Sequence, residues 1–185
     1  MGFETISACA ITVMLFAVWV FSVMRKDAGI IDVFWGLGYG LIAALAIINA
    51  AHLSPPLQAL YALVILWSLR LGGHLFIRWR NEAEEDKRYQ AMRRNAGSGF
   101  WWKSLYIVFG LQGFLMFLVA QPLIQLYDYS NAAPSAPTAF WLFTIIGAIG
   151  LIIETVSDVQ LTRFREAKTG GILQSGLWAR SRHPN

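Results

Sequence analysis

The chain has 185 residues, of which 56% are hydrophobic and only 14% are charged, and its formal net charge is +4. A soluble domain of this size exposes a large fraction of its atoms to water, so it could not hide so much apolar surface. The composition therefore excludes an ordinary soluble domain and predicts a membrane protein. The one cysteine, Cys9, excludes an internal disulfide and a thiolate metal cluster, and we expect no metal site.

Five stretches are long and apolar enough to be membrane-spanning helices, which need about 20 mostly apolar residues each. The first is not a signal peptide, because Arg25 and Lys26 follow it and no small-residue cleavage site stands out. We therefore expect an all-α membrane helical bundle that forms a single membrane domain over residues 1–185. The predicted spans are 5–24, 30–50, 57–78, 104–126 and 139–161.

The basic residues fall on one side of this predicted topology. All but one of the 15 Lys and Arg residues lie just after the first span, in or beside the polar segment 79–103, or in the tail 162–185. Cytoplasmic loops of membrane proteins accumulate Lys and Arg, so we expect the N-terminus outside and the 79–103 loop and the C-terminus in the cytoplasm. This asymmetry explains the positive charge without a nucleic-acid partner. The 79–103 loop is predicted to form a short amphipathic helix ended by Gly97 and Gly99.

The second span begins with the stretch "IIDVFWGLGYG". Asp32 lies in its first turn, where a carboxylate suits the positive end of the helix dipole. Two interpretations of Asp32 stay open: a helix cap or interface anchor, and a residue of a substrate pocket. Trp35, one turn further along, is a second candidate pocket residue. Gly36 and Gly40 are four residues apart, a spacing typical of close helix packing.

The third span carries Arg70, His74 and Arg78, which share one helix face because they recur every four residues. Arg78 can extend toward the headgroups, whereas Arg70 lies two turns deeper. An ionised group at that depth is costly, so Arg70 needs a carboxylate, a ligand or a wet cavity. His74 is either a pocket residue or a packing residue.

The fifth span ends with Glu154 and Asp158, two like charges that destabilise a bare helix at this spacing. Arg165 follows Asp158 on roughly the same face, about 10 Å further along. This pattern predicts a site for a polar ligand that has hydroxyls or amides and a phosphate. The alternative is a salt-bridge ladder that ends the helix. Together with Asp32 and Arg70, these residues are consistent with one cavity open to the cytosol.

Five fragments in order, "IIDVFWG", "WSLRLGGHLFIRW", "EDKRYQAMR", "ETVSDVQLTRFR" and "GLWARSRHPN", resemble the uncharacterised bacterial branch of the steroid 5-alpha-reductase C-terminal domain superfamily. The resemblance runs from about residue 30 to the last residue. It implies an all-helical bundle in a bacterial inner membrane. A cytosolic pocket in that bundle would bind NADPH for reduction of a carbon–carbon double bond in a steroid, sterol or other apolar lipid.

Carried over residue by residue, the resemblance makes Asp158, Arg165 and Asn185 cofactor contacts, with Arg182 and His183 in the same turn as Asn185. Arginine offers a planar fork to phosphate, carboxylates accept hydrogen bonds from ribose hydroxyls, and an asparagine can satisfy a carboxamide in both directions. Glu154 stands where some members have an amide, and its added carboxylate would repel phosphate. The candidate proton donors are Tyr89 and His183.

In family members the Ser-Arg-His-Pro-Asn motif usually continues with Tyr, then Gly-Glu, and further membrane helices. The sequence therefore reads as truncated within the motif, and we expect this form to bind the cofactor weakly or not at all. Two other functions stay open. One is an S-adenosylmethionine-dependent methyltransferase of the isoprenylcysteine or phospholipid type, which shares an Arg-His-Pro motif. The other is a non-enzymatic membrane scaffold. The expected partners are membrane lipid and an apolar, lipid-like substrate.

Overall fold

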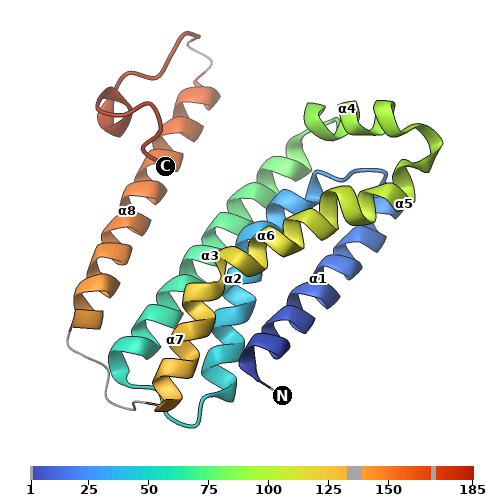
Figure 1. Ribbon diagram of the computed structural model, residues 1–185. Coiled ribbons are helices and arrows are strands. Elements are labelled where there is room, and N and C mark those ends of the chain that lie inside the picture. Colours follow the sequence, from blue (N-terminus) through green and yellow to red (C-terminus); the bar gives the residue numbers. More distant parts are fainter. Residues whose placement is uncertain (1, 133–138, 168–169) are drawn as a thin grey trace. The chain divides into compact units, whose positions relative to one another are not determined.

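The computed structural model describes residues 2–132, 139–167 and 170–185, and within these ranges every regular element is helical (Figure 1). The all-α prediction is therefore confirmed. The elements are α1 (Phe3–Arg25), α2 (Ile30–Asn49), α3 (Pro55–Asn81), α4 (Lys87–Ala96), η1 (Gly97–Gly99), α5 (Phe100–Ser104), the π-helical η2 (Leu105–Gly110), α6 (Leu111–Val119), α7 (Gln121–Ala132), α8 (Ala139–Glu166) and the 3₁₀ turn η3 (Gly176–Ala179).

Five helical runs in the described ranges are long and apolar enough to cross a membrane, as the hydropathy pattern predicts. Four of them begin within two residues of the predicted spans. The fourth differs, because one continuous run extends from Lys87 to Val119 and a new helix begins at Gln121. Pro122 explains the break at Ala120, since proline lacks an N–H and its ring clashes with the carbonyl four residues earlier.

The described chain forms two compact units, Met1–Ala136 and Pro137–Asn185. In the first unit, α2 packs against α1, α3, α6 and α7 and is the most buried of the spans. Large side chains without solvent exposure form the centre of this unit: Ile31, Ile42, Tyr61, Phe109, Met116 and Ile124. In the second unit, the tail packs against α8 through η3.

Small residues allow α2 and α3 to approach closely, which confirms the packing prediction for Gly36 and Gly40. A Cβ atom on Gly40 would lie 2.2 Å from Ser68 Oγ, and one on Gly36 would lie 3.0 Å from Leu71 Cδ2. The Ser68 hydroxyl donates a hydrogen bond of 2.9 Å to the Gly36 carbonyl. In a bilayer, where apolar surface alone gives little drive for helix association, such close contacts hold helices together.

The polar segment between the third and fourth spans forms the short amphipathic helix that the sequence predicts. α4 begins after Asp86, whose carboxylate accepts a hydrogen bond from the backbone N–H of Arg88 at 2.8 Å. Aspartate is a favoured N-cap residue because it satisfies one of the free N–H groups of the first turn. The helix ends at Gly97, which adopts a φ of 62°.

Candidate functional site

The tail of the second unit folds back onto the C-terminal half of α8. The indole N–H of Trp178 donates to the Ser157 carbonyl at 3.0 Å, and the backbone N–H of Leu177 donates to Gln160 Oε1 at 3.0 Å. Gly176 has a φ of 61°, and a Cβ atom there would lie 2.6 Å from the Gln160 amide. This left-handed backbone conformation favours glycine, which fixes where the tail turns toward the helix.

This fold-back brings Asp158 and Asn185 together. The side-chain amide of Asn185 donates a hydrogen bond of 2.7 Å to Asp158 Oδ1. Asp158 is 7% exposed, and Ser157 beside it is fully buried. A carboxylate so shielded needs hydrogen-bond partners, and an amide donor supplies one. Two residues that stand 27 positions apart in the sequence thus form one polar cluster.

The other residues assigned to the cofactor lie in the same unit. Arg165, Arg182 and His183 are exposed, and Glu154 is half-buried one turn before Asp158 on α8. The backbone N–H of His183 donates to Ser181 Oγ at 3.2 Å, which fixes the tail conformation near the cluster. Among the described residues, no group of three or more His, Cys, Asp and Glu could hold a metal ion.

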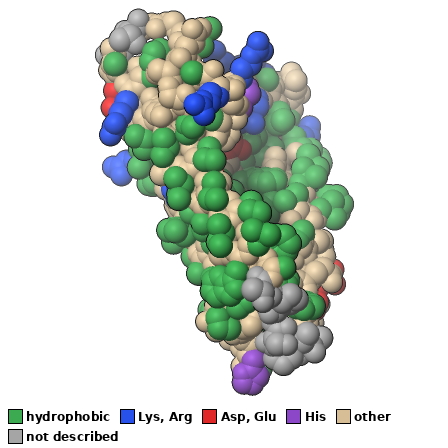
Figure 2. Space-filling view, turned by 90° about the vertical axis from the view of Figure 1, so that its left-hand side faces the viewer, with side chains coloured by type: hydrophobic (Ala, Val, Ile, Leu, Met, Phe, Trp, Pro, Cys, Tyr) green, Lys and Arg blue, Asp and Glu red, His purple; other side chains and the backbone are tan. Residues whose placement is uncertain are grey.

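The spanning part of α8 is covered by apolar side chains, in keeping with a lipid environment. Ile145, Ile149 and Ile152 are all more than half exposed. Figure 2 looks onto this helix and shows hydrophobic side chains along it, with Lys and Arg side chains gathered toward the end where the tail folds back. The polar cluster of Asp158 and Asn185 therefore lies at the charged end of an apolar helix.

In the first unit, Asp32 forms hydrogen bonds and an ion pair with residues of α4. The Tyr89 hydroxyl donates to Asp32 Oδ1 at 2.9 Å, and Arg88 Nη2 contacts Asp32 Oδ2 at 2.7 Å. Arg88 also bonds Asp86 at 3.0 Å, and this guanidinium lowers the pKa of the Asp86 carboxyl below its usual value. Asp32 thus anchors α4 to the start of α2, and Tyr89 is almost fully buried.

A second network at the same end of the bundle was not predicted from the sequence. Glu85 accepts hydrogen bonds from the backbone N–H of Ala28 at 2.8 Å and from Arg93 at 2.8 Å and 2.9 Å. Asp27 Oδ2 accepts from the Trp79 indole N–H at 2.7 Å. These bonds hold the α1–α2 loop against α3 and α4. The acidic run before α4 indicates a cap, but the sequence gives no indication of which loop it meets.

The remaining pocket candidates are spread over α2 and α3. The Trp35 indole N–H donates to the Gln112 side chain of α6, and its ring packs edge-on against Tyr39. Arg70 and His74 are partly buried on α3. Within the first unit, the structure therefore groups Asp32 with Tyr89 and places Trp35 in a separate α2–α6 contact. Gln112, a partly buried polar residue in a membrane-spanning run, was not predicted from the sequence.

The largest cavity described here has a volume of about 620 Å³ and lies among α1, α2 and α3. Its walls are apolar and include Val18, Phe34, Leu69, Phe76 and Trp79. A much smaller hollow of about 20 Å³ shares Val33 and Trp79 with it and contains Asp32 and Asp86. The small polar hollow around Asp32 thus adjoins the apolar cavity through Val33 and Trp79.

Residues 18–185 match the model of a protein family that is described as "Protein of unknown function (DUF1295)", and the chain belongs to this family. The match begins inside α1 and includes every site residue discussed above. Comparisons with curated proteins and with solved structures found no match.

Proposed function

We propose that this member of the DUF1295 family is a membrane oxidoreductase that uses NADPH to reduce a carbon–carbon double bond in a steroid, sterol or other apolar lipid. One observation carries the proposal. The tail folds back so that the Asn185 amide donates a hydrogen bond to the buried Asp158 carboxylate. Arg165 and Arg182 lie exposed in the same unit. The resemblance in sequence assigns these same residues to a cofactor.

The chemistry of these side chains fits a dinucleotide phosphate. Arg165 and Arg182 would bind phosphate through charge-assisted hydrogen bonds. The Asp158 carboxylate, which accepts from Asn185 through Oδ1, would also accept a hydrogen bond from a ribose hydroxyl. Glu154 would contact a hydroxyl or amide, since its charge disfavours phosphate. When bound, NADPH would supply the hydride for the reduction.

The apolar cavity of the first unit supports an apolar substrate. Its volume of about 620 Å³ falls within the range of small-molecule sites, roughly 300–1,000 Å³. Its lining is almost wholly hydrocarbon, so the hydrophobic effect would drive binding of a lipid rather than of a polar metabolite.

A cytosolic cofactor requires the charged ends of the helices to face the cytoplasm. In the first unit, the C-terminal ends of α1 and α3 and the whole of α4 lie at one end of the bundle, and these segments carry its Lys and Arg residues apart from Arg70 and Lys103 (Figure 1). This gathering supports an orientation with the N-terminus outside and the basic loops in the cytoplasm of a bacterial inner membrane.

The test is ligand-dependent thermal stability in detergent, measured with NADPH and with S-adenosylmethionine. A ligand at 100 times its Kd stabilises a protein by about 2.7 kcal/mol, so binding of NADPH should raise Tm clearly. Arg165→Ala should weaken NADPH binding by roughly tenfold or more, because it removes a charge-assisted hydrogen bond. Arg163→Ala, an exposed arginine on the same helix, should leave the affinity unchanged and serves as the control.

The measurement should be made on this chain and on any longer product that its gene encodes. Stabilisation by S-adenosylmethionine instead of NADPH would identify a methyltransferase. Stabilisation by neither ligand in either form would leave a non-enzymatic scaffold and end the proposal.

Reduction of the double bond also needs a proton, and Tyr89 is the candidate donor in the first unit. Tyr89→Phe should abolish turnover while NADPH affinity stays unchanged, because the change removes only the hydroxyl that bonds Asp32. Tyr106→Phe, at an exposed tyrosine of η2, is the matched control. A Tyr89→Phe variant that loses Tm and NADPH affinity together, or that keeps full turnover, would assign Tyr89 a structural role only.

A further inference from the structure

We infer that the first unit carries a binding site for one glycerophospholipid with a singly anionic headgroup, built along the seam between α1 and the α5–η2–α6 run. The site is separate from the residues proposed to bind NADPH and from the apolar cavity among α1, α2 and α3. It has two parts, a polar pocket at the charged end of the bundle and an apolar groove that continues from it.

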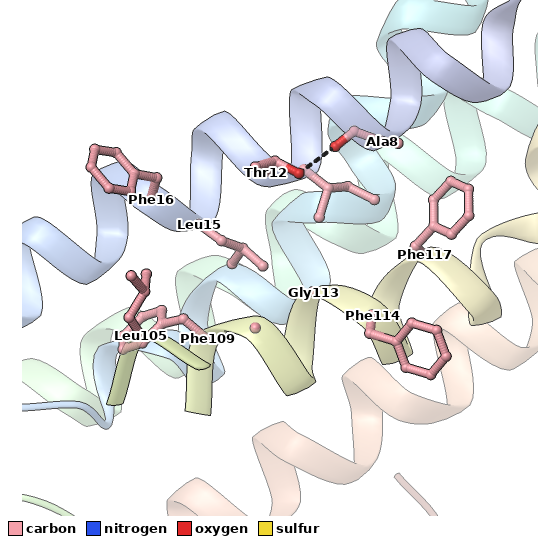
Figure 3. A pocket seen from close by; sticks show the side chains of 11 residues that line it. Ala8, Thr12, Leu15, Phe16, Leu105, Phe109, Gly113, Phe114 and Phe117 are labelled. Carbon is pink, nitrogen blue, oxygen red and sulfur yellow. Dashed lines mark hydrogen bonds between the residues drawn. The ribbon is translucent and has the colours of Figure 1, made fainter. Parts of the chain in front are cut away.

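The groove has a volume of about 300 Å³ and lies between α1 and the η2–α6 segment (Figure 3). Figure 3 shows Leu15 and Phe16 on the α1 side of it and Leu105 and Phe109 on the other side. Thr12 is the one polar side chain among the residues that line it, and its hydroxyl already donates to the Ala8 carbonyl at 2.8 Å, so these side chains have no free O–H or N–H donor for a ligand. Such a surface suits an acyl chain.

Two features of the sequence shape the groove. The chain is π-helical over Leu105–Gly110, a widened turn that departs from regular α-helical packing. Gly113 brings the helix close to Leu15, since a Cβ atom there would lie 2.8 Å from Leu15 Cδ1. The groove extends over Ala8 to Phe16 on α1, which corresponds to about 12 Å at 1.5 Å per residue.

The polar pocket lies at the end of the same two helices and has a volume of about 330 Å³. Lys26, Arg93 and three serines line it, and no carboxylate does. Arg93 is paired with Glu85 and rests over the Phe100 ring at 4.5 Å, so its charge is largely offset. Lys26 is exposed and supplies the remaining positive charge. One net positive charge matches one phosphodiester.

Trp19 connects the two parts. Its indole N–H donates to the Trp101 carbonyl at 3.1 Å and to Ser104 Oγ at 3.3 Å, both in residues that line the polar pocket. Its ring lies 5.4 Å from that of Phe16, which lines the groove. The exposed Trp101 and Trp102 belong at the level of lipid headgroups, which puts the pocket at headgroup depth and the groove at chain depth.

The test is native mass spectrometry of the purified protein in detergent, titrated with phosphatidylglycerol and with phosphatidylcholine of the same acyl chains. We expect one phosphatidylglycerol to bind more tightly than phosphatidylcholine. Lys26→Asn should weaken the binding of phosphatidylglycerol by about fivefold, because it removes one cation near the headgroup. Asparagine is chosen because Lys26 has a φ of 56°, which asparagine tolerates. Arg25→Gln removes a charge that does not line the pocket and should have no effect.

The groove is tested by Thr12→Trp, which places a large ring between the two helices. This variant should weaken the binding of both lipids, whereas Val13→Trp, at an exposed neighbour outside the groove, should not. Stabilisation by inorganic phosphate alone, with no loss in Thr12→Trp, would make the pocket an anion site and overturn the lipid assignment. Equal affinities for the two lipids, or equal losses in Lys26→Asn and Arg25→Gln, would also overturn it.

Discussion

Replacing Glu85 with alanine should destabilise the first unit by about 3 kcal/mol, one of the largest single effects available outside the spans. The Glu85 side chain is 9% exposed and accepts from both a backbone N–H and the Arg93 guanidinium. Removal of one partner of a buried ion pair costs about 3–5 kcal/mol, because it leaves the other charge uncompensated. The lower end of this range applies because the Arg93 side chain is 34% exposed and can reach water. The loss should lower Tm by roughly 6–12 °C.

Glu84→Ala is the matched control for this experiment. Glu84 precedes Glu85, is exposed, and its Oε2 lies 3.4 Å from the Gln90 amide, a weak contact. Its replacement should change Tm by no more than a degree or two, as exposed substitutions usually do. Thermal melts followed by tryptophan fluorescence suit the test, because Trp79 belongs to the same network through Asp27. Equal Tm values for the two variants would show that Glu85 does not hold the α1–α2 loop.

The fold follows from sequence patterns that act locally. Hydropathy alone predicts the five spans, and Gly97 predicts where α4 ends because few other residues adopt its backbone conformation. The spacing of Gly36 and Gly40 predicts a close helix contact, which the structure assigns to α3. The end of the fourth span was predicted too late in the chain, since its apolar residues continue beyond the break that Pro122 imposes at Ala120.

The candidate site was predictable only in part, since its residues meet through the fold. Asp158 stands out in the sequence because it and Glu154 place two like charges four residues apart at the end of an apolar helix, but its contact with Asn185 depends on the turn at Gly176. Glu85 and Arg93 look like ordinary surface charges in the sequence. Trp35 and Gln112 are 77 residues apart, and nothing in either neighbourhood indicates that α2 meets α6 there. The roles of the candidate site residues in cofactor binding, substrate binding and proton transfer stay predictions.

The α2–α3 contact gives the second large expected effect, because Gly40→Ala should destabilise the bundle although alanine favours helices. Helix propensity alone would stabilise the variant by up to about 1 kcal/mol. The new methyl group, however, would lie 2.2 Å from Ser68 Oγ and 2.7 Å from Ser68 Cβ. Ser68 is buried and donates to the Gly36 carbonyl, so it cannot turn away without losing that hydrogen bond. Overpacking of this kind costs about 1–3 kcal/mol and therefore outweighs propensity.

Gly73→Ala separates the two contributions, because Gly73 is also helical but a Cβ atom there meets nothing within 4 Å. Its Tm should stay the same or rise, whereas that of Gly40→Ala should fall by several degrees. Ser68→Gly removes both atoms that the new methyl group would strike. The double variant Gly40→Ala/Ser68→Gly should therefore be more stable than the sum of the single effects predicts, with a coupling of about 1 kcal/mol or more. Strict additivity would mean that α2 and α3 do not depend on this contact to stay together.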